Sequence, residues 1–348
     1  MTSSDIKNKA LALGYAGCGI IQAVEFDEYV RHLEERIAAF PDSAKAYENL
    51  YKLAVPPENS RSLIVCTKAY TQYRVPDGMD TYYGKYYLFD GRLPYTEEAR
   101  ARSEFEIYLT TSLRSVRNAS VSARWAAARA GIGCFTRSNF IVDPKNGSYV
   151  WVETWAVDDE LEYDTPPKSY IAPGCRSNCR KCIEACPTGA LSSDYTMDRT
   201  KCIAHLTFGV NDIPAEGLRM QMGRWLYGCD ACQDACPINK PWTGSVDFPL
   251  LVDHTPHLTP ERILEMDEQQ YLDIVHPRFW YIGKDSLWLW KCNALRAMVN
   301  SGEERYYPAI QKNCGNPDAR VREMAEWGCR ALGLDHKELR TKVEMLGF

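Results

Sequence analysis

Eight of the fourteen cysteines lie in one short stretch of the chain, between residues 175 and 237. The first group reads Cys-x3-Cys-x2-Cys-x3-Cys-Pro, and the second ends in Cys-x2-Cys-x3-Cys-Pro. A C-x2-C-x2-C-x3-C-P run is typical of ferredoxins with two iron–sulfur clusters, in which its last cysteine ligates the other cluster. The spacing therefore predicts two [4Fe–4S] clusters. The first would take Cys175, Cys179, Cys182 and Cys236, and the second Cys202, Cys229, Cys232 and Cys186.

Zinc and disulfide bonds are the alternative interpretations of so many cysteines. Four-cysteine zinc sites usually show two C-x2-C pairs a dozen or more residues apart, without Cys-Pro ends. Disulfides suit short secreted chains, and this chain has 348 residues. The gap of three residues between Cys175 and Cys179 departs from the ferredoxin spacing. Cysteines outside the two groups lack ligand spacing, and Cys66, in an apolar strand, is predicted to be a core residue.

Composition predicts a chain of two or three domains with a sizeable core, because 45% of the residues are hydrophobic and 11% aromatic. A net charge of −5 argues against a strongly electrostatic nucleic-acid binder. The N-terminus has no apolar signal core, and no apolar run approaches the roughly 20 residues of a membrane span. Abundant cysteine without a signal peptide predicts a cytoplasmic protein with no membrane partner, in which thiols hold metal.

The first third of the chain predicts an α/β layer. Helices are expected over 3–13 and 26–39, from apolar residues at helical spacing. Strands are expected over 15–21 and 62–66, which are short and apolar. Alternation of helix and strand in this order indicates helices packed on a sheet.

Residues 70–95 form a predicted loop with seven tyrosines and three glycines. A long loop rich in aromatic residues is often functional. As a set, the tyrosines are predicted to wall a pocket for a flat ligand. The alternative is a surface loop held in place by tyrosine packing.

A helical region is predicted over 97–130, followed by Gly131 and Gly133 and a strand ending at Val142. The alternating pattern over 139–157, around an Asp-Pro-Lys-Asn-Gly turn, predicts a β-hairpin. The Gly-x-Gly does not indicate a dinucleotide site, because no strand precedes it and no helix follows. Toward the C-terminus, helices over 260–267, 286–299 and 317–332, the last capped by Asn316, indicate a small helical-repeat segment.

Placed together, these pieces resemble the epoxyqueuosine reductase family, cobalamin-dependent relatives of the reductive dehalogenases. The resemblance rests on "ALALGYAGCGI", "AARAGIG…SNFIV…NGSYVW" and above all "CRKCIEACPTGAL…KCIAHLTFGV…YGCDACQDACP". The stretches "NALRAMVNSG" and "VREMAEWGCRALG" look like the family's helical tail. The resemblance implies an α+β protein with three parts. These are a nitroreductase-like α/β cobalamin-binding module over 1–165, a two-cluster ferredoxin domain over 166–245 and a helical-repeat-like segment over 246–348.

The resemblance also implies a reductase whose clusters relay single electrons to cobalamin, which removes oxygen or another leaving group from a substrate. Electrons would come from an external low-potential donor, a ferredoxin or flavodoxin, since iron–sulfur potentials reach about −700 mV. The predicted cobalamin contacts are Tyr82, Tyr83, Tyr87, Gly131, Gly133, Asn139 and Ser148.

The proton donor is where this chain departs from the family. The family's acid is an Asp shortly before the Ala-Gly-x-Gly piece, and this chain has Arg117 in that segment. Tyr86, with Arg117 stabilising its phenolate, is the predicted catalytic pair, because a nearby cation lowers the pKa of a tyrosine. Glu104 or Glu106 is an alternative donor. Arg117 could instead bind a cobalamin phosphate or pair with Glu106.

Three functions remain open at this point. Acidic and basic residues alternate in the C-terminal segment, which favours a small-molecule substrate over a tRNA anticodon loop. A true tRNA reductase with a donor other than Asp is the second possibility. An electron-transfer or cobalamin-reactivating partner protein without a substrate of its own is the third.

Overall fold

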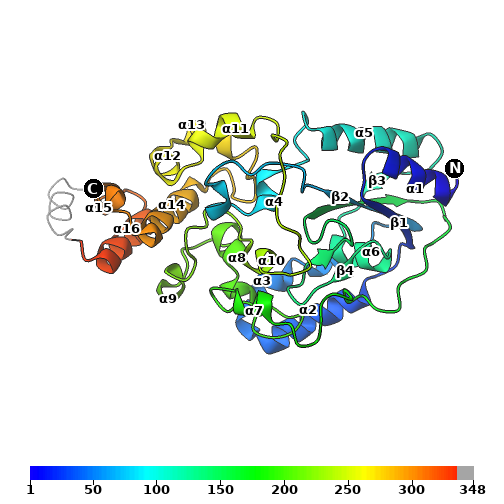
Figure 1. Ribbon diagram of the computed structural model, residues 1–348, viewed down its shortest axis with the longest axis horizontal. Helices are drawn as coiled ribbons and strands as arrows, with labels where there is room; N and C mark the ends of the chain where they lie inside the picture. The colour runs from blue at the N-terminus through cyan, green and yellow to red at the C-terminus, as the bar shows by residue number, and fades with distance from the viewer. Residues whose placement is uncertain (335–348) are drawn as a thin grey trace. The chain divides into compact units, whose positions relative to one another are not determined.

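The computed structural model describes residues 1–334, and these residues form two compact units that interleave along the chain (Figure 1). Unit 1 comprises residues 1–74, 91–200 and 231–246, and unit 2 comprises the described remainder, residues 75–90, 201–230 and 247–334. The end of the predicted helical segment, residues 335–348, lies outside the described residues.

Unit 1 is built on a four-stranded antiparallel sheet with the order β1-β2-β6-β3. The strands are β1 (Gly17–Gln22), β2 (Ser62–Ala69), β3 (Arg117–Asn118) and β6 (Val150–Val157). Across the sheet, Ile20 lies opposite Ile64, and Ile64 lies opposite Trp155. The strands expected at 15–21 and 62–66 are therefore neighbours, which confirms the α/β layer.

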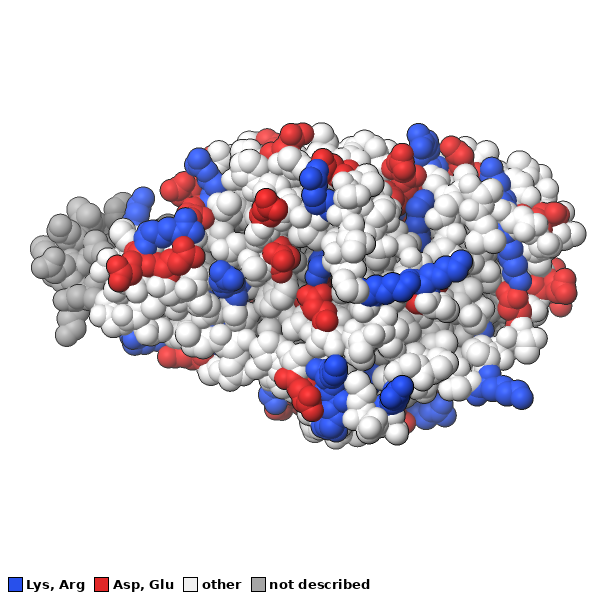
Figure 2. Space-filling view, in the orientation of Figure 1, with Lys and Arg blue, Asp and Glu red and all other residues white. Residues whose placement is uncertain are grey.

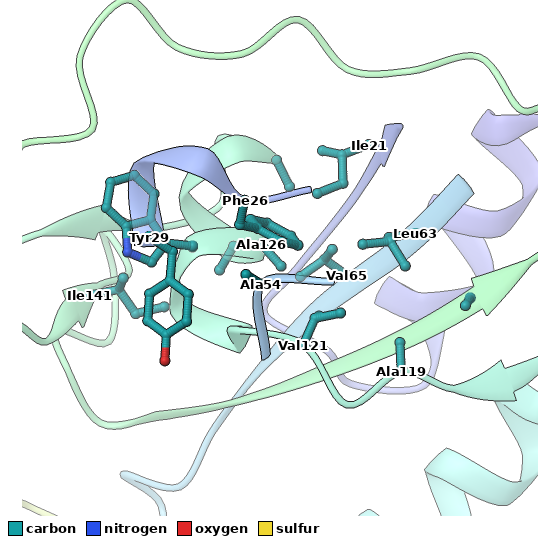
Figure 3. Packing of buried hydrophobic residues seen from close by; sticks show 14 of the residues in the cluster. Ile21, Phe26, Tyr29, Ala54, Leu63, Val65, Ala119, Val121, Ala126 and Ile141 are labelled. Carbon is teal, nitrogen blue, oxygen red and sulfur yellow. The ribbon is translucent and has the colours of Figure 1, made fainter. Parts of the chain in front are cut away.

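Helices cover both faces of this sheet. The four helices are α1 (Ser3–Ala12), α2 (Asp27–Ala39), α5 (Glu97–Thr110) and α6 (Ala123–Arg129). In β2, Ile64 and Cys66 point into the core under α1 and α5, with Trp155 and Phe105. Leu63 and Val65 point into the opposite core, with Phe26 of the α2 side and Ala126 of α6 (Figure 3). The first seven residues of β2 are all buried and their side chains alternate between the two faces, which requires a sheet covered on both sides.

Two corrections concern the strands after α6. Strands β4 (Cys134–Phe135) and β5 (Ile141–Val142) pair with each other in a separate two-stranded sheet. The Asp143–Gly147 turn is closed by a bridge between those two residues, yet β6 pairs with β2 and β3 rather than with β5. The predicted 139–157 hairpin is therefore wrong, because β6 pairs along its whole length with the eight-residue strand β2.

The helical region predicted over 97–130 is present as two helices. The segment contains α5 and α6 with β3 between them, since residues 111–122 leave the helical path to reach the sheet edge. Helix α1 begins after Thr2, whose hydroxyl accepts a hydrogen bond from the Asp5 main-chain N–H. Three short helices complete unit 1: α3 (Ala44–Glu48), α7 (Lys181–Glu184) and α10 (Ala231–Asp234).

Unit 2 is helical and is centred on α14 (Leu287–Ser301), which is buried along most of its length. It is joined by α4 (Lys85–Leu88), α8 (Ile203–Phe208), α9 (Glu216–Arg219), α11 (Leu251–His254), α12 (Pro260–Glu265), α13 (Glu268–Gln270), α15 (Tyr307–Asn313) and α16 (Ala319–Leu332). Helix α14 packs against α12 and α16, and α15 packs against α16. Asp318, rather than the predicted Asn316, caps α16.

An aromatic cluster forms a second core in unit 2. It contains Tyr83, Tyr87, Phe208, Tyr227, Phe279 and Trp290. Tyr227 stacks on Trp290 with ring centroids 5.3 Å apart. Aromatic pairs of this kind add about 0.5–1.5 kcal/mol beyond the burial of their surface. Within residues 1–334, no helix combines the length and apolar character that crossing a membrane requires.

Candidate iron–sulfur and cofactor sites

Four predicted ligands of the first cluster meet in one pocket of unit 1. The pocket is lined by Cys175, Cys179, Cys182 and Cys236, together with the turns 136–138 and 237–238. Cys182 lies in α7, and Cys236 follows α10, which packs against α7. Burial and the neighbouring thiols of Cys175 and Cys236 raise the pKa of Cys182. The structure thus brings together cysteines that are 61 residues apart between the first and the last.

Arg137 holds the loop that carries the first two of these cysteines. Its main-chain N–H donates a hydrogen bond to the Sγ of Cys175 at 3.3 Å. Its buried guanidinium donates to the carbonyl oxygens of Arg176 and Cys179, at 2.8 and 2.6 Å. The same group pairs with Asp194, with Nε 2.6 Å from Oδ1. These contacts place Cys175 in the pocket despite the longer spacing that precedes Cys179.

The donors that line this pocket are those of an iron–sulfur cluster. A donor set of four thiols around one enclosed pocket, with an N–H directed at a sulfur, fits a [4Fe–4S] cluster.

The four cysteines predicted for the second cluster are divided between the units. Cys186 and Cys232 belong to unit 1, and Cys202 and Cys229 belong to unit 2. Cys202 is the residue before α8, and Cys229 follows Gly228, which has a φ of +79°. A Cβ at Gly228 would lie 2.4 Å from the Tyr87 ring, so the turn before Cys229 requires glycine.

Two of the predicted cofactor-binding tyrosines are core residues. Tyr83 is fully buried, stacks on Phe279 and donates its hydroxyl hydrogen to the Leu258 carbonyl at 2.7 Å. Tyr87 packs edge-on against Phe208 and Tyr227, and burial raises its pKa well above the usual value. Both rings take part in the aromatic packing of unit 2, and contact of either tyrosine with cobalamin stays a prediction.

Tyr82 and Tyr86 are the remaining tyrosines considered for the site. Both are half-buried, the Arg224 guanidinium lies over the Tyr82 ring, and the Tyr86 ring packs edge-on against Tyr87. Lys85, which precedes Tyr86, is buried with its Nζ 3.4 Å from Asp230 Oδ2. A role of Tyr82 or Tyr86 in chemistry stays a prediction.

Arg117 is occupied by neighbours in unit 1. In β3, its guanidinium donates to Asp158 Oδ1 at 2.9 Å and to the carbonyl oxygens of Ser115 and Glu58 at 2.7 Å. The considered pairing with Glu106 is wrong, since that carboxylate instead accepts a hydrogen bond from Trp155 Nε1. Tyr86 belongs to unit 2. The predicted partnership of Tyr86 with Arg117 stays a prediction.

The remaining predicted cofactor contacts lie in turns of unit 1. Gly131 ends the α6 turn with a φ of +70°, and a Cβ at Gly133 would lie 3.0 Å from Ile141. The Asn139 amide oxygen accepts from Arg36 at 2.7 Å. The Ser148 hydroxyl lies 2.9 Å from both Gln233 Oε1 and Asn239 Nδ2. Each of these residues therefore has a structural role, and cobalamin contact by any of them stays a prediction.

A second cavity of unit 1, of about 330 Å³, was not predicted from the sequence. Its wall includes Trp242, Tyr149, Lys145 and Lys240. Trp242 Nε1 donates to the Tyr73 carbonyl at 2.9 Å, and its ring meets Tyr149 edge-on with centroids 5.0 Å apart. Trp242 lies five residues after the Cys-Pro pair of the second group. An aromatic residue so close to the cysteine motif was the feature of the sequence that could have indicated this cavity. No pattern in the sequence indicated that Arg137 holds the cluster loop, because this role depends on contacts with residues distant in sequence.

Comparison with known proteins agrees with this geometry. The family model "4Fe-4S double cluster binding domain" matches residues 175–239. Epoxyqueuosine reductase of Cellulophaga algicola is 30% identical over 250 residues, covering 68% of this chain and 78% of that protein. The Bacillus subtilis epoxyqueuosine reductase is 39% identical over 139 residues, covering 40% of this chain and 34% of that protein.

Solved structures share the fold over nearly the whole chain. A crystal structure of epoxyqueuosine reductase with an epoxyqueuosine-modified tRNA-Tyr stem loop matches with a TM-score of 0.73 at 21% identity, covering 95% of this chain and 90% of that chain. The epoxyqueuosine reductase of Streptococcus thermophilus matches with a TM-score of 0.71 at 19% identity, covering 99% and 94%. These matches show a mixed α+β fold with a ferredoxin-type domain and a helical C-terminal region.

The cysteine pocket and the double-cluster match together define an iron–sulfur oxidoreductase with two [4Fe–4S] clusters. The chain belongs to the epoxyqueuosine reductase family, and is an epoxyqueuosine reductase-like reductase that depends on cobalamin and iron–sulfur clusters. The resemblance stated from sequence is thereby confirmed. The family acts in queuosine modification of tRNA.

The fit of cobalamin can be tested against the cavity beside Trp242. Pockets for drug-sized ligands measure roughly 300–1,000 Å³, and cobalamin is larger than such ligands. At about 330 Å³ the cavity is too small for a whole corrin. In this cavity Trp242 would offer an aromatic surface, and Lys145 and Lys240 would offer positive charge, to one part of the cofactor.

Proposed function

We propose that this protein reductively removes the oxygen atom of an epoxide, and that epoxyqueuosine in tRNA is the substrate to test first. The observation that carries this proposal is the convergence of Cys175, Cys179, Cys182 and Cys236 on one pocket, within the match to double-cluster domains. Paired clusters suit delivery of single electrons at low potential. The relatives compared above bear the name epoxyqueuosine reductase, which supports the choice of substrate.

The reaction fixes what the chain must supply. Converting an epoxide to an alkene with release of water consumes two electrons and two protons. When bound, the clusters carry single electrons and cobalamin supplies the reducing cobalt centre. The chain's own residues must then bind the substrate, exclude water and donate a proton to the departing oxygen.

Tyr86 is the proposed proton donor. It is half-buried and its side chain extends from the short helix α4, which begins directly after Gly84. Arg117 is proposed as its cationic partner, a role that requires exchange of its present contacts with Asp158. Tyr82 and the lysines beside Trp242 are the proposed contacts to the cofactor periphery, together with Gly131, Gly133, Asn139 and Ser148.

The finer architecture is proposed from the packing. A nitroreductase-like module over 1–165 is supported by the sheet with helices on both faces. A ferredoxin-like stretch over 166–245 is supported by the cluster match. A helical-repeat-like segment over 246–348 is supported by the packing of α14, α15 and α16 within its described part.

A small-molecule substrate is the second candidate, and the charge distribution favours it. In the C-terminal segment, Arg305 pairs with Glu303, Arg320 with Asp318, and Arg330 with Glu216. On the face shown in Figure 2, basic and acidic side chains are interspersed rather than gathered in a continuous basic stripe. Phosphate backbones are normally bound by such stripes of Lys and Arg.

Anaerobic turnover distinguishes these candidates. The protein, reconstituted with iron, sulfide and cobalamin, is reduced with titanium(III) citrate and given either an epoxyqueuosine-containing tRNA stem loop or the free epoxyqueuosine nucleoside. We expect queuosine in the stem loop, detected by mass spectrometry after digestion. Turnover of the nucleoside alone would favour the small-molecule candidate. If both clusters and cobalamin are present and neither substrate turns over, the proposal fails and an electron-transfer role is favoured.

A further inference from the structure

A cluster of exposed cations surrounds the loop of the first iron–sulfur pocket. Between residues 165 and 183 the chain has four basic residues and no acidic one, although its net charge is −5. Lys168, Arg176, Arg180 and Lys181 are all exposed. Within residues 1–334, none of the four side chains has an ion-pair partner. We refer to Arg176, Arg180 and Lys181 as the basic collar.

The collar is directly attached to the cluster ligands. Arg176 follows Cys175, Arg180 follows Cys179, and Lys181 precedes Cys182. The backbone between these residues is held in place on its buried side, because the Arg137 guanidinium donates hydrogen bonds to the carbonyl oxygens of Arg176, Ser177 and Cys179. The collar side chains are thus held at the surface on a rigid loop.

Elsewhere in the chain, exposed basic residues are commonly neutralised. Arg61 pairs with Glu160 at 3.3 Å, and Arg305 pairs with Glu303 at 2.6 Å. In the loop itself, Asp194 is bound by Arg137 and so is not available to the collar. Three adjacent unpaired cations repel one another, and their exposure next to a redox site leaves the positive field open to a partner.

We propose that the basic collar is the docking surface for an acidic, low-potential, single-electron carrier protein, which reduces the first cluster from this side. This inference rests on the proposed function, because only a reductase requires such a carrier. The carrier's acidic surface complements the collar, and its redox group would approach the cluster through the loop that bears the ligands. The expected contribution is a faster encounter rather than a tight complex.

Stopped-flow reduction tests the proposal. The clusters of the reconstituted protein are reduced anaerobically by reduced flavodoxin, an acidic carrier, and the decay of cluster absorbance gives a second-order rate constant. In R176Q/R180Q/K181Q we expect this constant to fall at least about tenfold at low ionic strength and to lose most of its salt dependence. Reduction by titanium(III) citrate, iron content and the cluster potentials should stay close to those of the wild type.

A matched control removes three exposed cations from unit 2. R262Q/K284Q/K312Q changes the net charge by the same amount as the collar variant, at residues that are also exposed. Flavodoxin should reduce the clusters of this variant at the wild-type rate. Equal slowing of both triple variants, or no slowing of the collar variant, would overturn the proposal. So would loss of stem-loop RNA binding by the collar variant at an unchanged flavodoxin rate, since the surface would then serve RNA. Reduction of the clusters is measured without substrate. The result of this experiment therefore does not depend on whether the protein turns over a substrate in the earlier one.

Discussion

The main-chain N–H of Arg137 points at the sulfur of Cys175, 38 residues further along the chain, and lies 3.3 Å from it. The same residue's guanidinium binds three carbonyl oxygens of the loop 176–179 and the carboxylate of Asp194. One arginine therefore joins the turn after β4 to the cluster loop. Hydrogen bonds to cluster sulfurs and the rigidity of the ligand loop are both means by which a protein tunes a cluster.

We expect Arg137→Ala to impair the first cluster. Carbonyl groups that lose a charged donor cost about 1.5–3 kcal/mol each, and here three lose theirs at once. Iron content should fall from about eight toward about four atoms per chain, and the second cluster should remain. Iron and sulfide analysis with electron paramagnetic resonance of the reduced protein would measure this. Asp194→Asn is the control, because Asp194 is 47% exposed and its ion pair is expected to contribute little.

Replacing one ligand should separate the two clusters. Cys182→Ser removes a thiol of the first pocket, and about half of the iron should be lost while the other cluster persists. Cys66→Ala provides the comparison, since Cys66 is buried in the sheet core and lies outside both ligand sets. Retention of all iron by Cys182→Ser, or loss of iron from Cys66→Ala, would contradict the assignment.

The tyrosines of the 70–95 segment should fall into two classes. Tyr86→Phe is expected to lower turnover by about 10²–10⁴-fold without changing stability, since it removes the proposed donor. Tyr83→Phe should cost about 1–2 kcal/mol of unfolding free energy, because the Leu258 carbonyl loses its partner, and leave turnover unchanged. Steady-state kinetics and denaturant unfolding measure the two effects. A Tyr86→Phe enzyme of normal activity would remove Tyr86 from the mechanism.

A buried thiol pair predicts a loss of stability at alkaline pH. The sulfurs of Cys314 and Cys329 lie 3.5 Å apart between α15 and α16, and burial raises the pKa of Cys314 to about 12. In the unfolded chain a cysteine titrates near 8.5. Between about pH 8.5 and 12 the folded state therefore binds more protons than the unfolded state, so the unfolding free energy falls as pH rises.

Comparing urea unfolding of the wild type and Cys314→Ala from pH 8 to 10 tests this sign. The stability of the wild type should decline more steeply than that of the variant. Alkylation by iodoacetamide offers a second readout, in which Cys314 should react far more slowly than the partly exposed Cys134 in the folded protein. Equal slopes for the two proteins would show that the thiol is not titrating as described.

Local patterns predicted much of what the structure contains. The cysteine spacing predicted the four residues of the first pocket, because Cys175, Cys179 and Cys182 are arranged by their own loop and by α7. The helix over 26–39 was recognisable from the period that burial of one face leaves in the sequence. The strand from 62 was recognisable from a continuous apolar run, because both of its faces are buried. The helical C-terminal region followed from the same signal in α14 and α16.

Pairings between distant segments were not predictable in this way. The alternation in β6 indicated a strand but could not distinguish β5 from β2 as its partner, since either would bury the same residues. The aromatic content of 70–95 could not show that Tyr83 would stack on Phe279, about 200 residues later. Arg137 was missed for the same reason: its acceptors are main-chain oxygens, which every sequence offers.

The interleaving of the two units has a consequence for any attempt to dissect the protein. The polypeptide changes unit after residues 74, 90, 200, 230 and 246, so any single cleavage between residues 75 and 246 leaves two fragments that each contain incomplete portions of both units. A cut anywhere in that range therefore disrupts both units at once, and neither unit can be transplanted into another protein as one continuous segment.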